Sequence, residues 1–212
     1  MVLQRTECEK DLGVWVQQDG HWNTHIQNVT NKCTQRLGLI KRTFKYKYPQ
    51  AIKLLYTSLV RPVLEYGNTV WSPQYKNQTN KIEKIQKRAT KIISGYGDEN
   101  YETRLKNLNL LPLEDRRLRG DLISFFKISS GLEEVNWFHP PRYLNNATRG
   151  HTKKIQRELT TKSIQRYYHL PNRVAPYWNC LPSEAVESPT TNKFKNAIDK
   201  IGIEMIKARR LK

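Results

Sequence analysis

The spacing of apolar residues restricts the fold of this chain more than any other feature of its sequence. Along residues 23–44, apolar side chains recur at intervals of three and four and so share one stripe of an α-helix. This stripe consists of Ile26, Val29, Cys33, Leu37, Ile40 and Phe44. A second stripe, over residues 77–93, consists of Ile82, Ile85, Ala89 and Ile92. Because each stripe needs an apolar partner, the pattern predicts a mainly α fold of packed helices.

Prolines and glycines mark where further helices begin and end. Pro49 is placed to begin a second helix, and Pro62 to kink or end it. The apolar residues that we expect to line this helix are Ala51, Leu54, Leu55, Leu59 and Val63. Gly95 follows the helix over 77–93 as a stop signal. Another helix is predicted to open at Pro112 and to close at Gly131.

The segment before the first helix predicts a short β-hairpin over residues 9–22. Leu12, Val14 and Val16 alternate with other residues, as in a strand with one buried face. Asp19-Gly20 is typical of a two-residue turn that needs positive φ. Because a single hairpin is marginally stable by itself, we expect it to pack on a helical layer or a larger sheet.

The last third of the chain is less regular than the rest. Proline pairs, asparagine pairs and a glycine between residues 132 and 165 indicate loops. A final helix and a basic tail follow. We therefore expect a hairpin over 1–22, a helical domain over 23–131, a loop-rich linker over 132–165, and a partly irregular helical segment with a basic tail over 166–212.

The charge of the chain favours a polyanionic partner. Its 212 residues include 37 Lys and Arg against 19 Asp and Glu, which gives a formal net charge of +18. An excess of this size points first to nucleic acid and second to an anionic membrane surface. The alternative is an ordinary basic surface without a specific partner. No apolar run approaches the ~20 residues of a membrane span, so no membrane association is expected.

Three groups of basic residues are expected to lie on rigid helices, where they could follow a phosphate backbone. The candidate nucleic-acid-binding residues are Lys41, Arg42, Lys45, Lys81, Lys84, Arg88, Lys91, Arg116, Arg117 and Arg119. Tyrosines that lie near basic residues could stack on unpaired bases; these are Tyr46, Tyr48, Tyr167 and Tyr168. The alternative is that the charged faces are only solvated and the aromatic residues belong to the core.

No constellation of residues predicts catalysis. A polymerase needs carboxylates that converge on two Mg²⁺ ions, and the six aspartates of this chain are all isolated. Asp121 lies close to Arg117 and Arg119, which favours a structural ion pair. His21 and His25 have the spacing of metal ligands on a helix, but only Cys8 or Cys33 could supply a third ligand nearby. We therefore expect His21 to be a hairpin or cap residue and His25 to lie on the helix surface. We predict no catalytic residues, no metal site and no cofactor.

The cysteines and the N-terminal segment indicate an intracellular protein. Cys8, Cys33 and Cys180 are odd in number and far apart, which favours reduced thiols over a disulfide framework. The chain does not open with a signal peptide. The expected location is therefore nuclear or cytoplasmic, and not secreted.

Several short segments occur in a fixed order along nearly the whole chain. They are Lys10-Asp11-Leu12-Gly13-Val14, Arg36-Leu37-Gly38-Leu39-Ile40, Ser58-Leu59-Val60-Arg61-Pro62-Val63-Leu64-Glu65-Tyr66-Gly67, Arg116-Arg117-Leu118-Arg119-Gly120-Asp121 and Trp178-Asn179-Cys180-Leu181-Pro182. In order and spacing they resemble the region that follows the polymerase core in reverse transcriptases of non-LTR retrotransposons, the LINE elements of the jockey and chicken-repeat kind. The resemblance extends from about Lys10 to Ile201.

The resemblance implies an architecture and a set of partners. It implies that the hairpin is the end of a palm, followed by a thumb-like helical bundle and a downstream connection. The implied partners are RNA, DNA or an RNA–DNA hybrid. Because the catalytic core of the family precedes this region, the chain resembles a truncated fragment without polymerase activity of its own. A palm-containing polypeptide could complement it in trans, and Mg²⁺ would serve only that missing core. The alternative is a helical adaptor, structural or inert protein derived from a mobile element.

Overall fold

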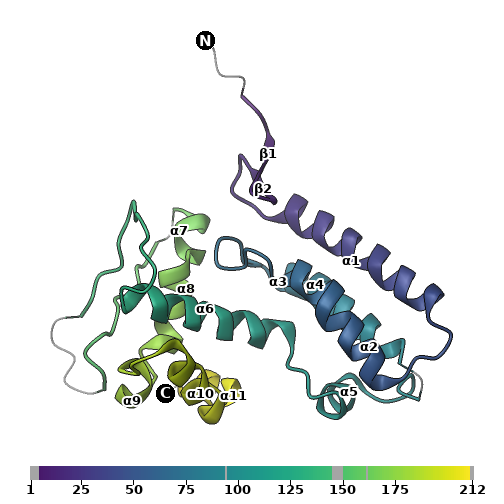
Figure 1. Ribbon diagram of the computed structural model, residues 1–212. Helices are drawn as coiled ribbons and strands as arrows, with labels where there is room; N and C mark the ends of the chain where they lie inside the picture. Colours follow the sequence, from purple (N-terminus) through teal and green to yellow (C-terminus); the bar gives the residue numbers. More distant parts are fainter. Residues whose placement is uncertain (1–4, 94, 145–149, 161, 211–212) are drawn as a thin grey trace. The chain divides into compact units, whose positions relative to one another are not determined.

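The computed structural model describes residues 5–93, 95–144, 150–160 and 162–210, and it confirms a mainly helical fold behind an N-terminal hairpin (Figure 1). Its elements are β1 (Cys8–Asp11), β2 (Val14–Gln17), α1 (Asn23–Thr43), α2 (Pro49–Leu55), the π-helical turn η1 (Tyr56–Val60), α3 (Arg61–Glu65), α4 (Lys76–Lys91), α5 (Tyr101–Asn107), α6 (Leu113–Ser129), α7 (Ile164–Tyr168), α8 (Leu170–Trp178), α9 (Ser183–Val186), α10 (Thr191–Ile201) and α11 (Ile203–Arg210). Across these residues, no helix combines the length and apolar character that a membrane crossing requires.

The chain forms two compact units. Unit 1 comprises Met1–Arg116 and unit 2 comprises Arg117–Lys212. Each unit has a hydrophobic cluster of its own: the cluster of unit 1 extends in sequence from Val14 to Leu113, and that of unit 2 from Leu122 to Ile206.

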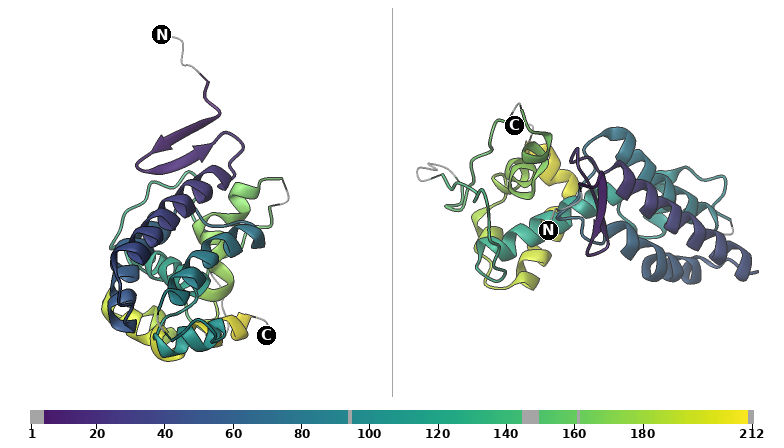
Figure 2. Two further views of the ribbon diagram at one scale, coloured as in Figure 1. Left: turned by 90° about the vertical axis from the view of Figure 1, so that its right-hand side faces the viewer. Right: turned by 90° about the horizontal axis from the view of Figure 1, so that it is seen from above.

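The hairpin turns earlier than its sequence predicted. Strands β1 and β2 pair antiparallel, with Asp11 opposite Val14, so the turn is Leu12-Gly13 and not Asp19-Gly20 (Figure 2). Leu12 and Gly13 have φ of 43° and 89°, and glycine supplies the second value without strain. The predicted apolar face is also wrong, because Leu12 occupies the turn and is 84% exposed, and only Val14 is buried. Gly20 instead turns the chain toward α1.

Helices α1 and α4 pack through the two stripes that the sequence predicted. The buried residues are Ile26, Val29, Cys33, Leu37 and Ile40 on α1, and Ile82, Ile85 and Ala89 on α4. Gln78, in the first turn of α4, donates a hydrogen bond of 2.8 Å to Asn23, the first residue of α1. The last turns of both helices meet in a groove described below. The two helices therefore run parallel, and their C-terminal ends lie together.

The helix after Pro49 buries a different face from the predicted one. Its core residues recur every four positions, as Ile52, Tyr56, Val60 and Leu64. Leu54 and Leu59 were expected to be buried but are 67% and 47% exposed. The π-helical turn η1 ends immediately before the helical segment that contains Pro62. Because proline lacks an N–H and its ring crowds the carbonyl four residues earlier, a wider turn at this point lets the chain stay helical.

A buried hydrogen-bond network fixes the rotation of α4 about its axis. Gln86 accepts a hydrogen bond of 2.7 Å from the Tyr56 hydroxyl and donates to the Tyr101 hydroxyl and the Leu111 carbonyl at 2.9 and 3.0 Å. On the same helix, Glu83 accepts from the backbone N–H of Leu113 at 3.0 Å. Since this side of α4 faces inward, the lysines and arginine on its opposite side face solvent.

Unit 2 packs around aromatic side chains. The rings of Phe126 and Phe194 stack at 4.3 Å, and Phe125 meets Trp178 edge-on at 5.0 Å. All four side chains are buried. The Trp178 indole also donates to the Lys153 carbonyl at 2.7 Å.

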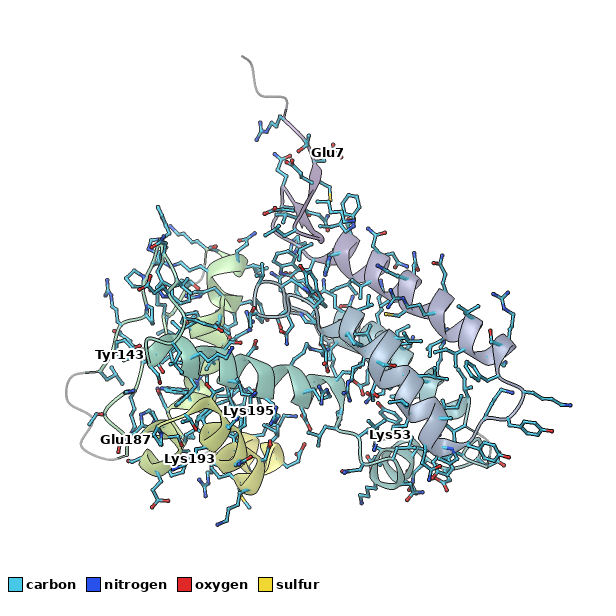
Figure 3. The ribbon with its side chains drawn as sticks, in the orientation of Figure 1. Glu7, Lys53, Tyr143, Glu187, Lys193 and Lys195 are labelled. Carbon is cyan, nitrogen blue, oxygen red and sulfur yellow. The ribbon has the colours of Figure 1, made fainter. Side chains whose placement is uncertain are left out.

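An extended segment lies along α8 and is held by two asparagine amides. Asn179 both accepts from and donates to the backbone of Ile155, at 3.0 and 2.8 Å. Asn172 makes the same two-way contact with the backbone of Glu158, at 2.7 and 3.0 Å. Ile155 also forms an isolated antiparallel bridge with Tyr143, which is labelled in Figure 3. The backbone N–H and C=O groups of Ile155 and Glu158 thus form hydrogen bonds with asparagine side chains, and one isolated bridge takes the place of a full sheet.

Candidate nucleic-acid interface

A groove with basic walls lies between α1 and α4 at their C-terminal ends. Its volume is about 530 Å³. Four cationic side chains line it: Lys41 and Lys47 from α1 and the following loop, and Arg88 and Lys91 from α4. The remaining lining residues are Thr34, Leu37, Gly38 and Ile92, so its interior is mostly apolar. We call this the α1/α4 groove.

Helical spacing explains how the sequence builds this groove. Gly38 and Lys41 are three residues apart on α1, as are Arg88 and Lys91 on α4, so each pair shares one helix face. At Gly38, a Cβ atom would meet nothing within 4 Å. The missing side chain leaves open space where the two parallel helices meet, and the hollow forms there.

The four groove cations have no acidic partner among the residues that the structure describes. In sequence, residues 20–64 contain eight Lys and Arg and no Asp or Glu. The C-terminal dipoles of α1 and α4 offset part of this charge, but each is worth only about half an elementary charge. Four positive charges against about one negative charge leave the groove strongly positive.

The structure brings part of the predicted site together. Lys41, Arg88 and Lys91 meet in the α1/α4 groove. Four further predicted residues are exposed on the same two helices or just after them: Arg42, Lys45, Lys81 and Lys84. Lys45 also lies over the Tyr46 ring, at 5.8 Å from its centroid. Seven of the ten predicted cations therefore lie on α1, on α4 or in the loop after α1, and three of these seven line the groove.

The three predicted arginines of α6 have a different environment. Arg116 forms a two-pronged ion pair with Glu65, and Arg119 forms another with Asp199 at 2.6 and 2.7 Å. Arg117 is only 5% exposed. Asp121 takes part in a structural ion pair, but with a partner that the sequence did not predict: Arg173, 52 residues away, donates to it at 2.8 and 2.9 Å. Carboxylates thus neutralise Arg116 and Arg119, and burial encloses Arg117.

Sequence reasoning left Gly38 out of the candidate binding residues, and it placed Lys47 with the basic residues that close the first helix. Gly38 stands in a helix interior, where glycine costs about 1 kcal/mol relative to alanine. An interior glycine three residues before a lysine is the signal that could have identified the floor of the groove. Lys47 lies in a loop, and no periodic pattern predicts where a loop side chain points.

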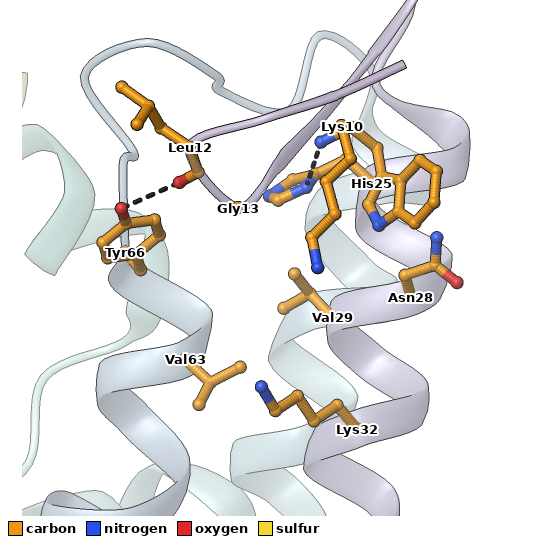
Figure 4. Close-up of a pocket in the computed structure, with 10 residues that line it drawn as sticks. Lys10, Leu12, Gly13, His25, Asn28, Val29, Lys32, Val63 and Tyr66 are labelled. Atoms are coloured by element: carbon orange, nitrogen blue, oxygen red, sulfur yellow. Dashed lines mark hydrogen bonds between the residues drawn. The ribbon is translucent and has the colours of Figure 1, made fainter. Parts of the chain in front are cut away.

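A second hollow lies between the hairpin, α1 and α3 (Figure 4). Its volume is about 350 Å³, and Lys10 and Lys32 are among its lining residues. The Tyr66 hydroxyl donates to the Leu12 carbonyl at 2.9 Å, which ties α3 to the hairpin turn. The backbone N–H of Trp15 donates to Nδ1 of His25 at 3.2 Å, which ties the hairpin to α1.

His25 is a buried structural histidine, so the prediction that it lies on the helix surface is wrong. It is 2% exposed, and this burial lowers its pKa to about 4. Its ring meets Trp71 edge-on at 4.5 Å. His21 pairs instead with Gln74 at 3.1 Å. Within the described ranges, no group of three or more His, Cys, Asp or Glu side chains could hold a metal ion.

Comparison with known proteins shows distant sequence similarity to two proteins, one of which is named as an RNA-directed DNA polymerase. It is 22% identical over 170 residues to a protein named "Probable RNA-directed DNA polymerase from transposon BS" of Drosophila melanogaster, an alignment that covers 78% of this chain and 17% of that protein. It is 25% identical over 124 residues to "Uncharacterized protein B0403.1" of Caenorhabditis elegans, which covers 57% of this chain and 63% of that protein. The chain thus spans less than two thirds of either relative. No protein-family model and no solved structure matches it.

Proposed function

We propose that this chain binds RNA, DNA or an RNA–DNA hybrid through the α1/α4 groove, with little choice of sequence. The observation that carries the proposal is the set of four groove cations without an acidic partner in the described part of the chain. Gathering like charges on a folded surface opposes stability, so such a set favours a role outside folding. Phosphates would release their counterions on contact with these cations.

The number of cations sets the expected salt dependence. Four phosphate contacts give a slope of log K against log salt of about −3.6 on duplex and about −2.8 on a single strand. Between 50 and 200 mM salt, affinity for a duplex would then fall about 150-fold. Arg116, Arg117 and Arg119 do not enter this count, because ion pairs or burial already engage them.

A salt titration tests this proposal. The protein is titrated into a labelled RNA–DNA hybrid at rising salt, with fluorescence anisotropy as the readout. The variant K41A/R88A/K91A removes three groove cations, and its slope should become shallower by about three. The matched control K193A/K195A/K200A removes three charges from α10, where Lys193 and Lys195 are labelled in Figure 3. Salt-independent binding, or equal loss in both variants, would contradict a site in the groove.

We also propose that the chain corresponds to the end of the palm, the thumb and the downstream connection of a non-LTR retrotransposon reverse transcriptase. The distant similarity to the transposon BS protein supports this relation. The sequence has no adjacent aspartate pair, which supports a fragment that needs a palm-containing polypeptide in trans for polymerisation. The chain alone, given Mg²⁺ and a primed template, should incorporate no nucleotides. Incorporation above that of a buffer control would contradict this assignment.

A second candidate function, a protein adaptor, is favoured by two exposed leucines that follow Pro49. Leu54 and Leu59 are largely exposed on α2 and η1. Such residues favour association with another protein. Light scattering after gel filtration distinguishes the two functions: an adaptor would associate through these leucines without affinity for nucleic acid, and L54S/L59S would abolish the association.

A further inference from the structure

The floor of the α1/α4 groove suits a base better than a phosphate. Leu37 and Ile92 contribute apolar surface, and Gly38 opens the space between them. A phosphate is charged and strongly hydrated, so it gains from the cationic rim but nothing from an apolar floor. The groove volume of about 530 Å³ lies within the roughly 300–1,000 Å³ of small-molecule sites. A planar base in the hollow, with its phosphate on the rim, would use both features.

An exposed pair of tyrosines flanks, in sequence, one of the lysines that line this groove. Tyr46 and Tyr48 flank the groove residue Lys47 and are 66% and 63% exposed. Their rings stack on each other with centroids 6.1 Å apart and planes 20° from parallel. Both rings therefore offer apolar faces to solvent within one residue of a cation that lines the groove. Stacking on successive bases is what such aromatic residues do in proteins that bind single strands.

We propose that the ligand of this site is an unpaired strand, with one base in the α1/α4 groove and neighbouring bases stacked on Tyr46 and Tyr48. The inference rests on the proposed nucleic-acid binding and specifies its ligand. A duplex keeps its bases stacked inside, so it can reach the cations but neither the apolar floor nor the tyrosine faces. A single strand can turn its bases outward and engage all three.

The inference is tested with the full chain, fluorescence anisotropy, a labelled oligouridylate and a blunt RNA duplex of the same length. The single strand should bind about tenfold more tightly or better, which is the contribution of one stacked base. Tyr46→Ala or Tyr48→Ala should weaken binding of the single strand about 5- to 150-fold. The duplex should be unaffected by either change. Y46F/Y48F keeps the stacking faces and is the conservative control.

The groove itself is probed by Gly38→Leu, which fills the hollow without a change in charge. A Cβ at this position meets nothing outside its own helix turn within 4 Å, so a side chain can begin here without a clash and extend into the groove that Gly38 lines. Gln35→Leu adds the same side chain at an exposed position on α1 that does not line the groove. Gly38→Leu should weaken the single strand selectively, and Gln35→Leu should not. Circular dichroism verifies that each variant folds, and the tyrosine variants decide between the outcomes if Gly38→Leu does not fold.

The outcomes separate the inference from the function on which it rests. If neither the strand nor the duplex binds, nucleic-acid binding itself is wrong. If the duplex binds as well as the strand and the tyrosine variants change neither, binding stands and the unpaired-strand ligand is wrong. If the tyrosine variants weaken both ligands equally, the rings contact the sugar–phosphate backbone, and the proposed stacking is again wrong.

Discussion

The two units carry similar excesses of positive charge and both hold arginines in ion pairs, but they differ in how other cations are arranged. Unit 1 has 19 basic and 11 acidic residues, and unit 2 has 18 and 8. In unit 1, four cations gather around one groove without an acidic partner in the described residues. In unit 2, three arginines are held by carboxylates: Arg119 by Asp199, Arg166 by Glu158 and Arg173 by Asp121. Net charge alone would have favoured unit 2 as the binding surface, whereas the arrangement of charge favours unit 1.

The largest effect is expected from removing a carboxylate in unit 2. The side chains of Arg173 and Asp121 are only 12% and 7% exposed. Asp121→Ala would leave the buried guanidinium without this partner and should cost about 3–5 kcal/mol of unfolding free energy. Urea denaturation measures this loss, and Lys91→Ala in unit 1 is the contrast, expected to cost almost nothing. A loss below about 1 kcal/mol for Asp121→Ala would break the distinction between the two units.

The next effect is a pH dependence that arises from His25 in unit 1. Burial lowers its pKa from 6.5 to about 4, so the unfolded chain binds more protons between these values. Stability is therefore full above pH 6.5 and declines as the pH falls toward 4, by about 3 kcal/mol from this group. Burial also lowers the pKa of His151 in unit 2, so the wild-type curve contains more than one contribution.

A matched variant isolates the contribution of His25. His25→Gln removes the titrating group and should flatten the decline in unfolding free energy between pH 7 and pH 4. The measurement is the difference between wild type and variant across that range. His21→Gln is the control, because His21 hydrogen-bonds Gln74 through a part-buried contact and lies outside the core. Equal slopes for wild type and His25→Gln would show that His25 is not held neutral.

A smaller effect, on the salt dependence of binding, is expected when one cation is removed from each unit in turn. Lys91→Ala should reduce the slope of log K against log salt by about one, because it removes one phosphate contact. Arg119→Ala should leave that slope unchanged, since its guanidinium already pairs with Asp199. Equal reductions would mean that the ion pair opens for the ligand and that the contrast between the units does not hold in the complex.

The smallest effect concerns the helix that carries the groove. Gly38→Ala should raise the stability of unit 1 by about 1 kcal/mol, because alanine is the better helix former and the added Cβ meets no atom within 4 Å. Thermal melts measure the gain. A destabilised Gly38→Ala would mean that the groove is narrower in solution than the structure indicates.

Local patterns predicted some parts of this molecule and could not predict others. The stripes of α1 and α4 follow from spacing alone, and they fix which face carries Lys41, Arg88 and Lys91. The face of the helix after Pro49 could not be fully derived in this way, because the π-helical turn changes the positions of later residues such as Leu59 relative to Ile52. The pair between Arg119 and Asp199 spans 80 residues, so no local rule connects the two. Predicting that Arg119 is neutralised requires the tertiary fold.

Asn172 in α8 and Asn179 directly after it restrict the length of the extended segment that they bind. Asn172 and Asn179 are seven residues apart, which is about 10.5 Å along a helix, and their targets Glu158 and Ile155 are three residues apart, which is about 10 Å of extended chain. The two lengths match only for this number of residues. One residue inserted between Ile155 and Glu158 would move one backbone group out of reach of its amide. We therefore expect that insertions and deletions between Ile155 and Glu158 are not tolerated.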